Sequence, residues 1–106
     1  MTGEQLKAAR KYHDALVDVL SKCVGGRAAY HTVLEIRHLC RAAFVAVEDD
    51  FCREQLGLIE AYAADLFSKA RHKPWHRGPV SGIDVLTHKI EKCLGAFEAR
   101  LIKHRQ

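Results

Sequence analysis

The fold is decided by residues 27–73, which read RAAYHTVLEIRHLCRAAFVAVEDDFCREQLGLIEAYAADLFSKARHK. This stretch contains no proline and a single glycine, Gly57. In each half, apolar residues recur every three or four positions, the spacing that places side chains on one face of a helix. The first stripe comprises Ala29, Val33, Ile36, Cys40, either Ala43 or Phe44, and Val47, and the second comprises Cys52, Leu56, Ile59, either Tyr62 or Ala63, Leu66 and Ala70.

Three acidic residues, Glu48, Asp49 and Asp50, separate the two stripes. Carboxylates suit a helix N-terminus because they accept hydrogen bonds from unpaired backbone N–H groups and favour the positive end of the helix dipole. We therefore predict a helical hairpin with helices over residues 27–47 and 50–73. A single unbroken helix would be roughly 70 Å long at about 1.5 Å per residue. The rest of this chain is too short to cover such a helix, so that alternative would require an elongated dimer.

One further helix is predicted on each side of the hairpin. On the N-terminal side, Thr2 and Gln5 have the spacing of a capping box, and Gly25 suits the left-handed conformation that closes a helix C-terminus. The first helix is therefore expected over residues 3–24. On the C-terminal side, both prolines lie within residues 74–79, which no helix should cross, and Ser81 is a suitable N-cap for a helix over residues 82–104.

The chain as a whole is predicted to be one all-α domain, residues 1–106, folded as an antiparallel up-down-up-down four-helix bundle. Hydrophobic residues make up 48% and charged residues 28% of the sequence, as in globular proteins. No apolar run approaches the length needed to cross a bilayer, and the N-terminus has no signal-peptide pattern. Four cysteines occur without a C-x-x-C pair, which is not a secreted disulfide framework. We expect a cytoplasmic protein that does not engage the membrane.

The predicted topology gathers positive charge at one end of the bundle. The chain has a formal net charge of +4, and the first and third connections should lie at the same end. We call this region the basic end and define it by Lys22, Arg27, Lys69, Arg71, Lys73 and Arg77. Cations can neutralise an anionic partner, and an exposed tryptophan can anchor a protein contact or stack on a base. The predicted partner-binding residues are Lys69, Arg71, His72, Lys73, Trp75, His76 and Arg77.

The same loop has two other interpretations. Trp75 can instead fold back onto the end of the bundle, leaving the cations solvated. The segment Arg71-His72-x-x-x-His76 also resembles the Arg-polar-x-x-x-His motif of HEPN ribonucleases, which are all-helical. The resemblance covers six residues and implies ribonuclease chemistry. That family carries its motif on a helix, whereas Pro74 lies inside this one.

A second candidate site lies in the predicted core. Counted at about 1.5 Å per residue from the basic end, His13, Cys40 and Cys93 reach similar depths along their helices, with Glu60 near the same level. Imidazole, thiolate and carboxylate groups can bind Zn²⁺ or Cu⁺, so these residues predict either a metal site or a redox-responsive thiol cluster. The alternative is that the cysteines are ordinary buried thiols and that His13 lies at the edge of its stripe.

A third candidate is His38, which is predicted to be exposed on its helix. His38 followed by Arg41 and Ala42 resembles the His-x-x-Lys-Gly segment of histidine phosphotransfer domains, which are four-helix bundles. The resemblance implies that His38 carries a phosphoryl group and that Arg41 stabilises it. Arginine replaces lysine here, and Ala42 stands where the family has glycine. The alternative is an ordinary solvated histidine.

No arrangement of residues indicates an enzyme. The sequence lacks a Ser-His-Asp or Cys-His pattern, a phosphate-binding glycine loop and a paired-carboxylate site, and we predict neither catalysis nor a cofactor. We predict a binding or regulatory protein whose partner is anionic, and we favour a protein partner over nucleic acid. The wide apolar faces also predict a homodimer. The apolar residues that are not needed to form one narrow bundle seam are Phe44, Phe51, Phe67, Val19, Leu58 and Ile102.

Overall fold

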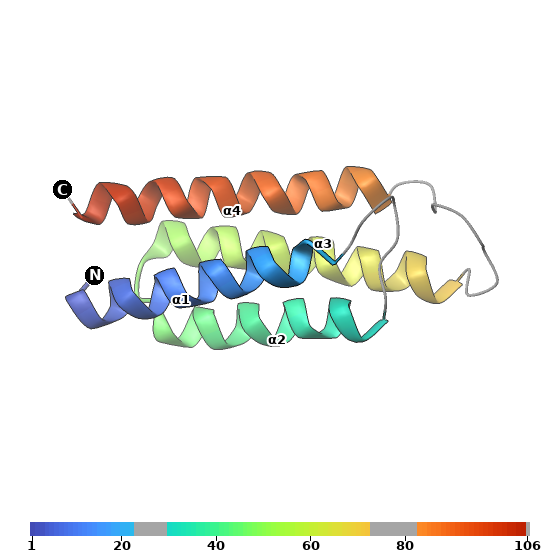
Figure 1. The fold of residues 1–106 in the computed structure, drawn as a ribbon, viewed down its shortest axis with the longest axis horizontal. Coiled ribbons are helices and arrows are strands. Elements are labelled where there is room, and N and C mark those ends of the chain that lie inside the picture. Colours follow the sequence, from blue (N-terminus) through green and yellow to red (C-terminus); the bar gives the residue numbers. More distant parts are fainter. Residues whose placement is uncertain (23–29, 73–82, 106) are drawn as a thin grey trace.

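The computed structural model describes residues 1–22, 30–72 and 83–105, with side chains described in those ranges except at positions 30, 67–72, 83–84 and 105. Its four helices are α1 (Gly3–Leu20), α2 (Tyr30–Ala46), α3 (Asp50–His72) and α4 (Ile83–Arg105). Each helix packs against its neighbour in sequence, and α4 returns to pack against α1 (Figure 1). These contacts confirm the predicted all-α four-helix bundle.

The core is built from the apolar stripes. The bundle measures 47 × 19 × 19 Å. Each helix contributes one row of buried apolar side chains, and these rows run along the long axis of the bundle. The two stripes of residues 27–73 are buried as predicted at every described position, with Ala43 rather than Phe44 and Ala63 rather than Tyr62 in the core. The largest fully buried side chains are Phe97, Leu16, Ile36, Leu56, Ile59, Leu66, Ile90 and Leu101. Burial of this apolar surface is the main force that holds the helices together.

Helix α1 begins at the predicted residue and ends before the predicted one. Its N-cap is Thr2, whose hydroxyl oxygen accepts a hydrogen bond from the backbone N–H of Gln5 at 3.1 Å. The predicted end at residue 24 is wrong, because α1 ends at Leu20 and residues 21 and 22 form a turn. The N–H of Lys22 bonds to the carbonyl of Val19, a three-residue spacing that tightens the last turn. The Ser21 hydroxyl also donates to a backbone carbonyl, which competes with helix continuation.

The bend between α2 and α3 is formed by the predicted acidic residues. Asp49 caps α3, because its Oδ2 accepts a hydrogen bond from the backbone N–H of Cys52 at 2.9 Å. Arg53 closes α2 from the other side of the turn: its Nε donates to the carbonyl oxygens of Phe44 (3.1 Å) and Val47 (2.9 Å). Carbonyl groups at a helix C-terminus need such donors, so the turn satisfies both helix ends. The predicted hairpin is confirmed.

The remaining helix ends determine where the other connections attach. The C-termini of α1 and α3 and the N-termini of α2 and α4 lie at one end of the bundle, and both chain termini lie at the other (Figure 1). Residues 23–29 and 73–82 therefore join helices at the same end. Among the described helices, none has the length and apolar character needed to cross a bilayer.

Candidate functional site

The predicted partner-binding residues fall at the margin of the described structure. Lys69, Arg71 and His72 occupy the last turn of α3, where only the backbone is described. The others, Lys73, Trp75, His76 and Arg77, lie outside the described residues. The position of Trp75 and the HEPN-like motif therefore stay predictions. The fold supports one part of the prediction, which is that the connection holding these residues joins the same end of the bundle as the connection after α1.

The predicted metal site is not formed. His13, Cys40 and Cys93 are all buried and described. Within residues 1–22, 30–72 and 83–105, however, no group of three or more His, Cys, Asp or Glu side chains is arranged to hold a metal ion. The reason is the direction of His13, whose two ring nitrogens contact carboxylates on the α1–α4 side of the bundle instead of the thiols.

The cysteines behave as buried thiols. Burial, followed by electrostatic interaction with Glu60 and with the neighbouring Cys93, raises the pKa of the Cys40 thiol to about 12. Counting residues along the helices therefore predicted correctly that Cys40, Glu60 and Cys93 lie near one another in the bundle. Burial, followed by contact with the Asp49 carboxylate, raises the pKa of Cys52 to about 12. Thiols are nucleophiles and metal ligands as thiolates, so the structure gives the redox interpretation no support.

His38 is exposed on α2, as predicted. The cation that the phosphotransfer resemblance assigns to it has another contact. Arg41 Nε donates to Glu60 Oε1 at 2.8 Å, which joins α2 to α3. A guanidinium that is paired with a carboxylate offers less charge to a phosphoryl group than a free one.

A buried polar contact in the described core surrounds His13. The side chain of His13 is buried, with its Nδ1 at 3.0 Å from Asp14 Oδ1 and its Nε2 at 3.1 Å from Glu98 Oε2 on α4. Its ring lies parallel to that of Phe97, with the ring centres 6.2 Å apart, which is an offset stack. Because a buried polar group needs partners, these contacts allow His13 to occupy a core position on α1.

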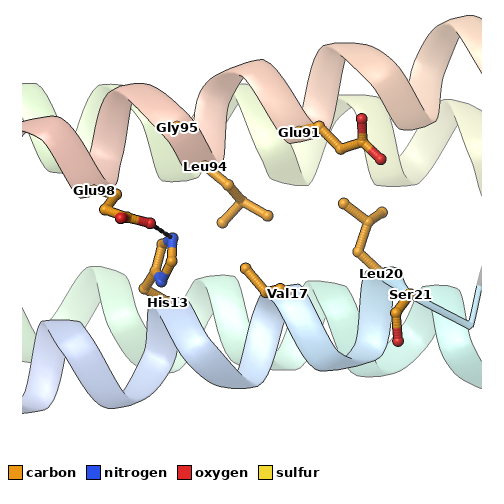
Figure 2. Close-up of a pocket in the computed structure, with 8 residues that line it drawn as sticks. All are labelled: His13, Val17, Leu20, Ser21, Glu91, Leu94, Gly95 and Glu98. Atoms are coloured by element: carbon orange, nitrogen blue, oxygen red, sulfur yellow. Dashed lines mark ion pairs between the residues drawn. The ribbon is translucent and has the colours of Figure 1, made fainter.

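An open groove runs between α1 and α4 beside this contact (Figure 2). It has a volume of about 480 Å³. Figure 2 shows Glu98 reaching His13 across one end of the groove, with Leu94 and Val17 further along it. We call this feature the α1–α4 groove and define it by His13, Val17, Leu20, Ser21, Glu91, Leu94, Gly95 and Glu98.

The α1–α4 groove combines an apolar floor with negative charge. No lysine or arginine lines it, whereas Glu91 and Glu98 do. The side chain of Glu91 is 59% exposed and lies 3.6 Å from His88, and that of Glu98 is 40% exposed. These carboxylates are accessible from solvent. Such a surface can accept a cationic group that also carries apolar atoms.

A second carboxylate cluster lies at the end of the bundle where α3 begins. Arg100 Nη2 and His104 Nε2, both on α4, each lie 3.2 Å from Asp49 Oδ1. Burial alone would raise the pKa of the Asp49 carboxyl. Hydrogen bonds from the Cys52 backbone N–H, Arg100, the Cys52 thiol and His104 outweigh burial and hold that pKa well below its usual range. Asp49 thus joins the start of α3 to the last turns of α4.

The carboxylate partners of His13 and His104 were not predicted from the sequence. Counting at about 1.5 Å per residue from the predicted helix ends places Glu98 roughly 7.5 Å deeper than His13, so the count indicates Cys93 as the neighbour of His13 and not Glu98. Asp49 was recognised as a helix cap, but its pairing with Arg100 and His104 was not. For Asp49 the signal is a complementary charge at similar depth on α4, which can be found only after the helix order is known.

Comparison of the chain with models of protein families, with curated proteins and with solved structures finds no match in any of the three.

Proposed function

We propose that this chain is a small cytoplasmic binding or regulatory protein without enzymatic activity. It engages an anionic partner through the basic end. The observation that carries the proposal is the separation of charge along the chain. All six cations of the basic end fall in two intervals, residues 19–34 and 66–83, that contain no Asp or Glu. Without these six, the other 11 of the 17 Lys and Arg residues face 13 acidic residues.

The bundle topology supports this proposal. Both intervals include a connection, and the helix ends that flank the connections lie together (Figure 1). Excess charge concentrated at one end of a molecule attracts and orients an oppositely charged partner, and it raises the rate of association. The opposite end contains both signs of charge, and there Asp49 pairs with Arg100.

We favour an acidic protein as the partner over nucleic acid. Stacking on single-stranded nucleic acid usually employs several aromatic side chains, each contacting one base. The predicted partner-binding segment, residues 69–77, contains one aromatic ring of this kind, that of Trp75. A single tryptophan surrounded by arginines is the composition of a protein-binding hot spot.

The experiment compares two triple variants with the same change in net charge. The test variant carries Arg71→Glu, Lys73→Glu and Arg77→Glu. The control carries Lys7→Glu, Lys11→Glu and Lys103→Glu, three exposed cations outside the basic end. Binding to poly-glutamate and to a single-stranded oligonucleotide is measured by fluorescence anisotropy. We expect the test variant to lose about tenfold or more in affinity for poly-glutamate and the control to stay within about threefold.

The salt dependence of binding separates the two kinds of partner. Nucleic-acid binding through about four phosphate contacts should weaken roughly a hundredfold between about 50 and 200 mM salt. If the oligonucleotide binds tightly with such a slope and poly-glutamate does not bind, the partner is nucleic acid. Equal losses in both triple variants would refute the basic end as the binding surface.

Self-association is a separate proposal. Of the residues that predicted a homodimer, Phe44, Phe51, Leu58 and Ile102 are exposed, which supports it. Val19 was wrongly included, because it is buried in the core, and the Phe67 side chain is not described. Sedimentation velocity at high micromolar concentration distinguishes the dimer from a monomer.

A further inference from the structure

We propose that the α1–α4 groove is a docking site for a helix of a partner protein that carries basic residues seven positions apart with apolar residues between them. The site is separate from the basic end and has the opposite charge. It rests on the shape of the groove, its apolar floor and the spacing of its two carboxylates.

The shape of the groove admits a helix. Of the adjacent helix pairs, α1 and α4 pack least closely in the described residues, so the surface between them is hollow. Gly95 lies on the α4 side of this hollow, and a Cβ atom placed on it would have open space around it. Small residues let a second backbone approach closely, and amphipathic helices dock in grooves of this kind.

The floor of the groove supplies an apolar contact. Val17 is 45% exposed on α1, and the buried Leu94 extends toward it from α4 (Figure 2). A leucine of the docked helix placed over Gly95 would cover both side chains. Burial of apolar area of this kind contributes about 25 cal/mol per Å² before the costs of association.

The charges of the groove define the pattern of the partner. Glu91 and Glu98 are seven residues apart on α4, so they are separated by about 10.5 Å along the helix axis. Two arginines seven positions apart on a parallel or antiparallel helix have the same separation and lie on one face. Glu98 uses Oε2 to contact His13, and its partial exposure leaves the carboxylate accessible to an arginine.

Other occupants fit the groove less well. A small organic cation would stay largely in solvent because the groove is open to solvent. An anionic membrane surface would be repelled by Glu91 and Glu98. A second copy of the chain would bring its own α1 and α4 carboxylates, including Asp14, close to the same two glutamates. A basic amphipathic helix matches both the charge and the floor.

The test uses three synthetic helical peptides of about 20 residues, each capped at both ends. The first has two arginines seven positions apart with leucines between them on one face. The second has glutamates in place of the arginines, and the third has the arginines moved to the opposite face. Binding to the full-length chain is measured by isothermal titration calorimetry. We expect the first peptide to bind at least about tenfold more tightly than either of the others.

Variants of the chain then locate the site. Gly95→Leu fills the groove and should reduce affinity for the first peptide at least about tenfold. Gly57→Leu is the matched control, because Gly57 is also an exposed helical glycine with open space around it and lines a hollow between α2 and α3. It should leave the affinity unchanged. Glu91→Gln, which spares the contact with His13, should reduce affinity roughly threefold to tenfold, since charge-assisted contacts are lost. Circular dichroism confirms that each variant is folded.

Three results would overturn the docking site. One is failure of the arginine peptide to bind at high micromolar concentration. Another is equal binding of the three peptides, which would show that neither charge nor its spacing is recognised. The third is an equal loss of affinity in Gly57→Leu and Gly95→Leu. Loss of binding in the triple variant of the basic end, with Gly95→Leu unaffected, would place the peptide at a different surface and would also refute the docking site.

Discussion

Helix α4 is joined to the rest of the bundle by two carboxylate–histidine contacts that differ in almost every physical respect. Asp49 is 9% exposed and lies against Cys52, Arg100 and His104. Glu98 is 40% exposed and pairs with His13 alone among the described residues. The Asp49 contact closes one end of the bundle, whereas the Glu98 contact borders an open groove.

The difference indicates which charges hold the fold and which remain available. A carboxylate with several donors in a shielded position has its hydrogen-bonding capacity used within the protein, and its removal leaves other buried groups unpaired. A half-exposed carboxylate with one partner contributes little to stability and can still receive a ligand. We therefore assign a structural role to Asp49 and a recognition role to Glu98. Three measurements test this assignment.

The largest effect is expected for Asp49→Ala. This substitution removes the N-cap of α3 and leaves Arg100 and His104 without their acceptor. The free energy of unfolding should fall by about 2–4 kcal/mol, measured by urea denaturation. Asp50→Ala is the control, because Asp50 is the exposed first residue of α3 and should change stability by no more than about 0.5 kcal/mol. Equal losses in the two variants would contradict the structural role of Asp49.

A smaller effect is expected from acid. The pKa of Asp49 is lower in the folded protein than in the unfolded chain, so its stabilisation is complete above about pH 5 and is lost as the pH falls. An unfolded aspartate has a pKa of about 3.9. Between pH 5 and pH 3 the wild-type chain should therefore lose about 1 kcal/mol more stability than Asp49→Asn. Parallel losses in the two proteins would show that Asp49 has an ordinary pKa.

The smallest effect is expected for Glu98→Gln. Glutamine keeps a hydrogen-bond acceptor near His13 and removes only the charge. Because Glu98 is partly exposed, the free energy of unfolding should change by about 0.5 kcal/mol. A loss as large as that of Asp49→Ala would mean that Glu98 holds the fold, and the distinction between the two contacts would fail.

The fold could be predicted from the sequence because its signals are local. The stripe from Val33 to Val47 and the acidic bend at Asp49 depend on residues close together in the chain, and the structure confirms both. The end of α1 was wrong for a local reason as well. Gly25 is a familiar helix terminator, but the last regular hydrogen bond is that of the Ser21 N–H, and the Lys22 N–H already bonds three residues back, to Val19.

The candidate sites were harder to predict because they depend on direction as well as depth. Counting residues along the helices correctly brought Cys40, Glu60 and Cys93 together. It could not show that His13 turns toward Glu98, because residues at one level can face different neighbours. Rotation of a helix about its axis is set by the packing of the whole bundle, here with Phe97 stacked on His13.

The buried thiols of Cys40, Cys52 and Cys93 lie one each on α2, α3 and α4. Because burial keeps them protonated, an alkylating reagent should modify each only when its helix separates from the others. With Cys23 replaced by serine, the modification rate of each cysteine, read by mass spectrometry, would report the opening of one helix. The chain thus carries its own set of reporters for the order in which the bundle comes apart.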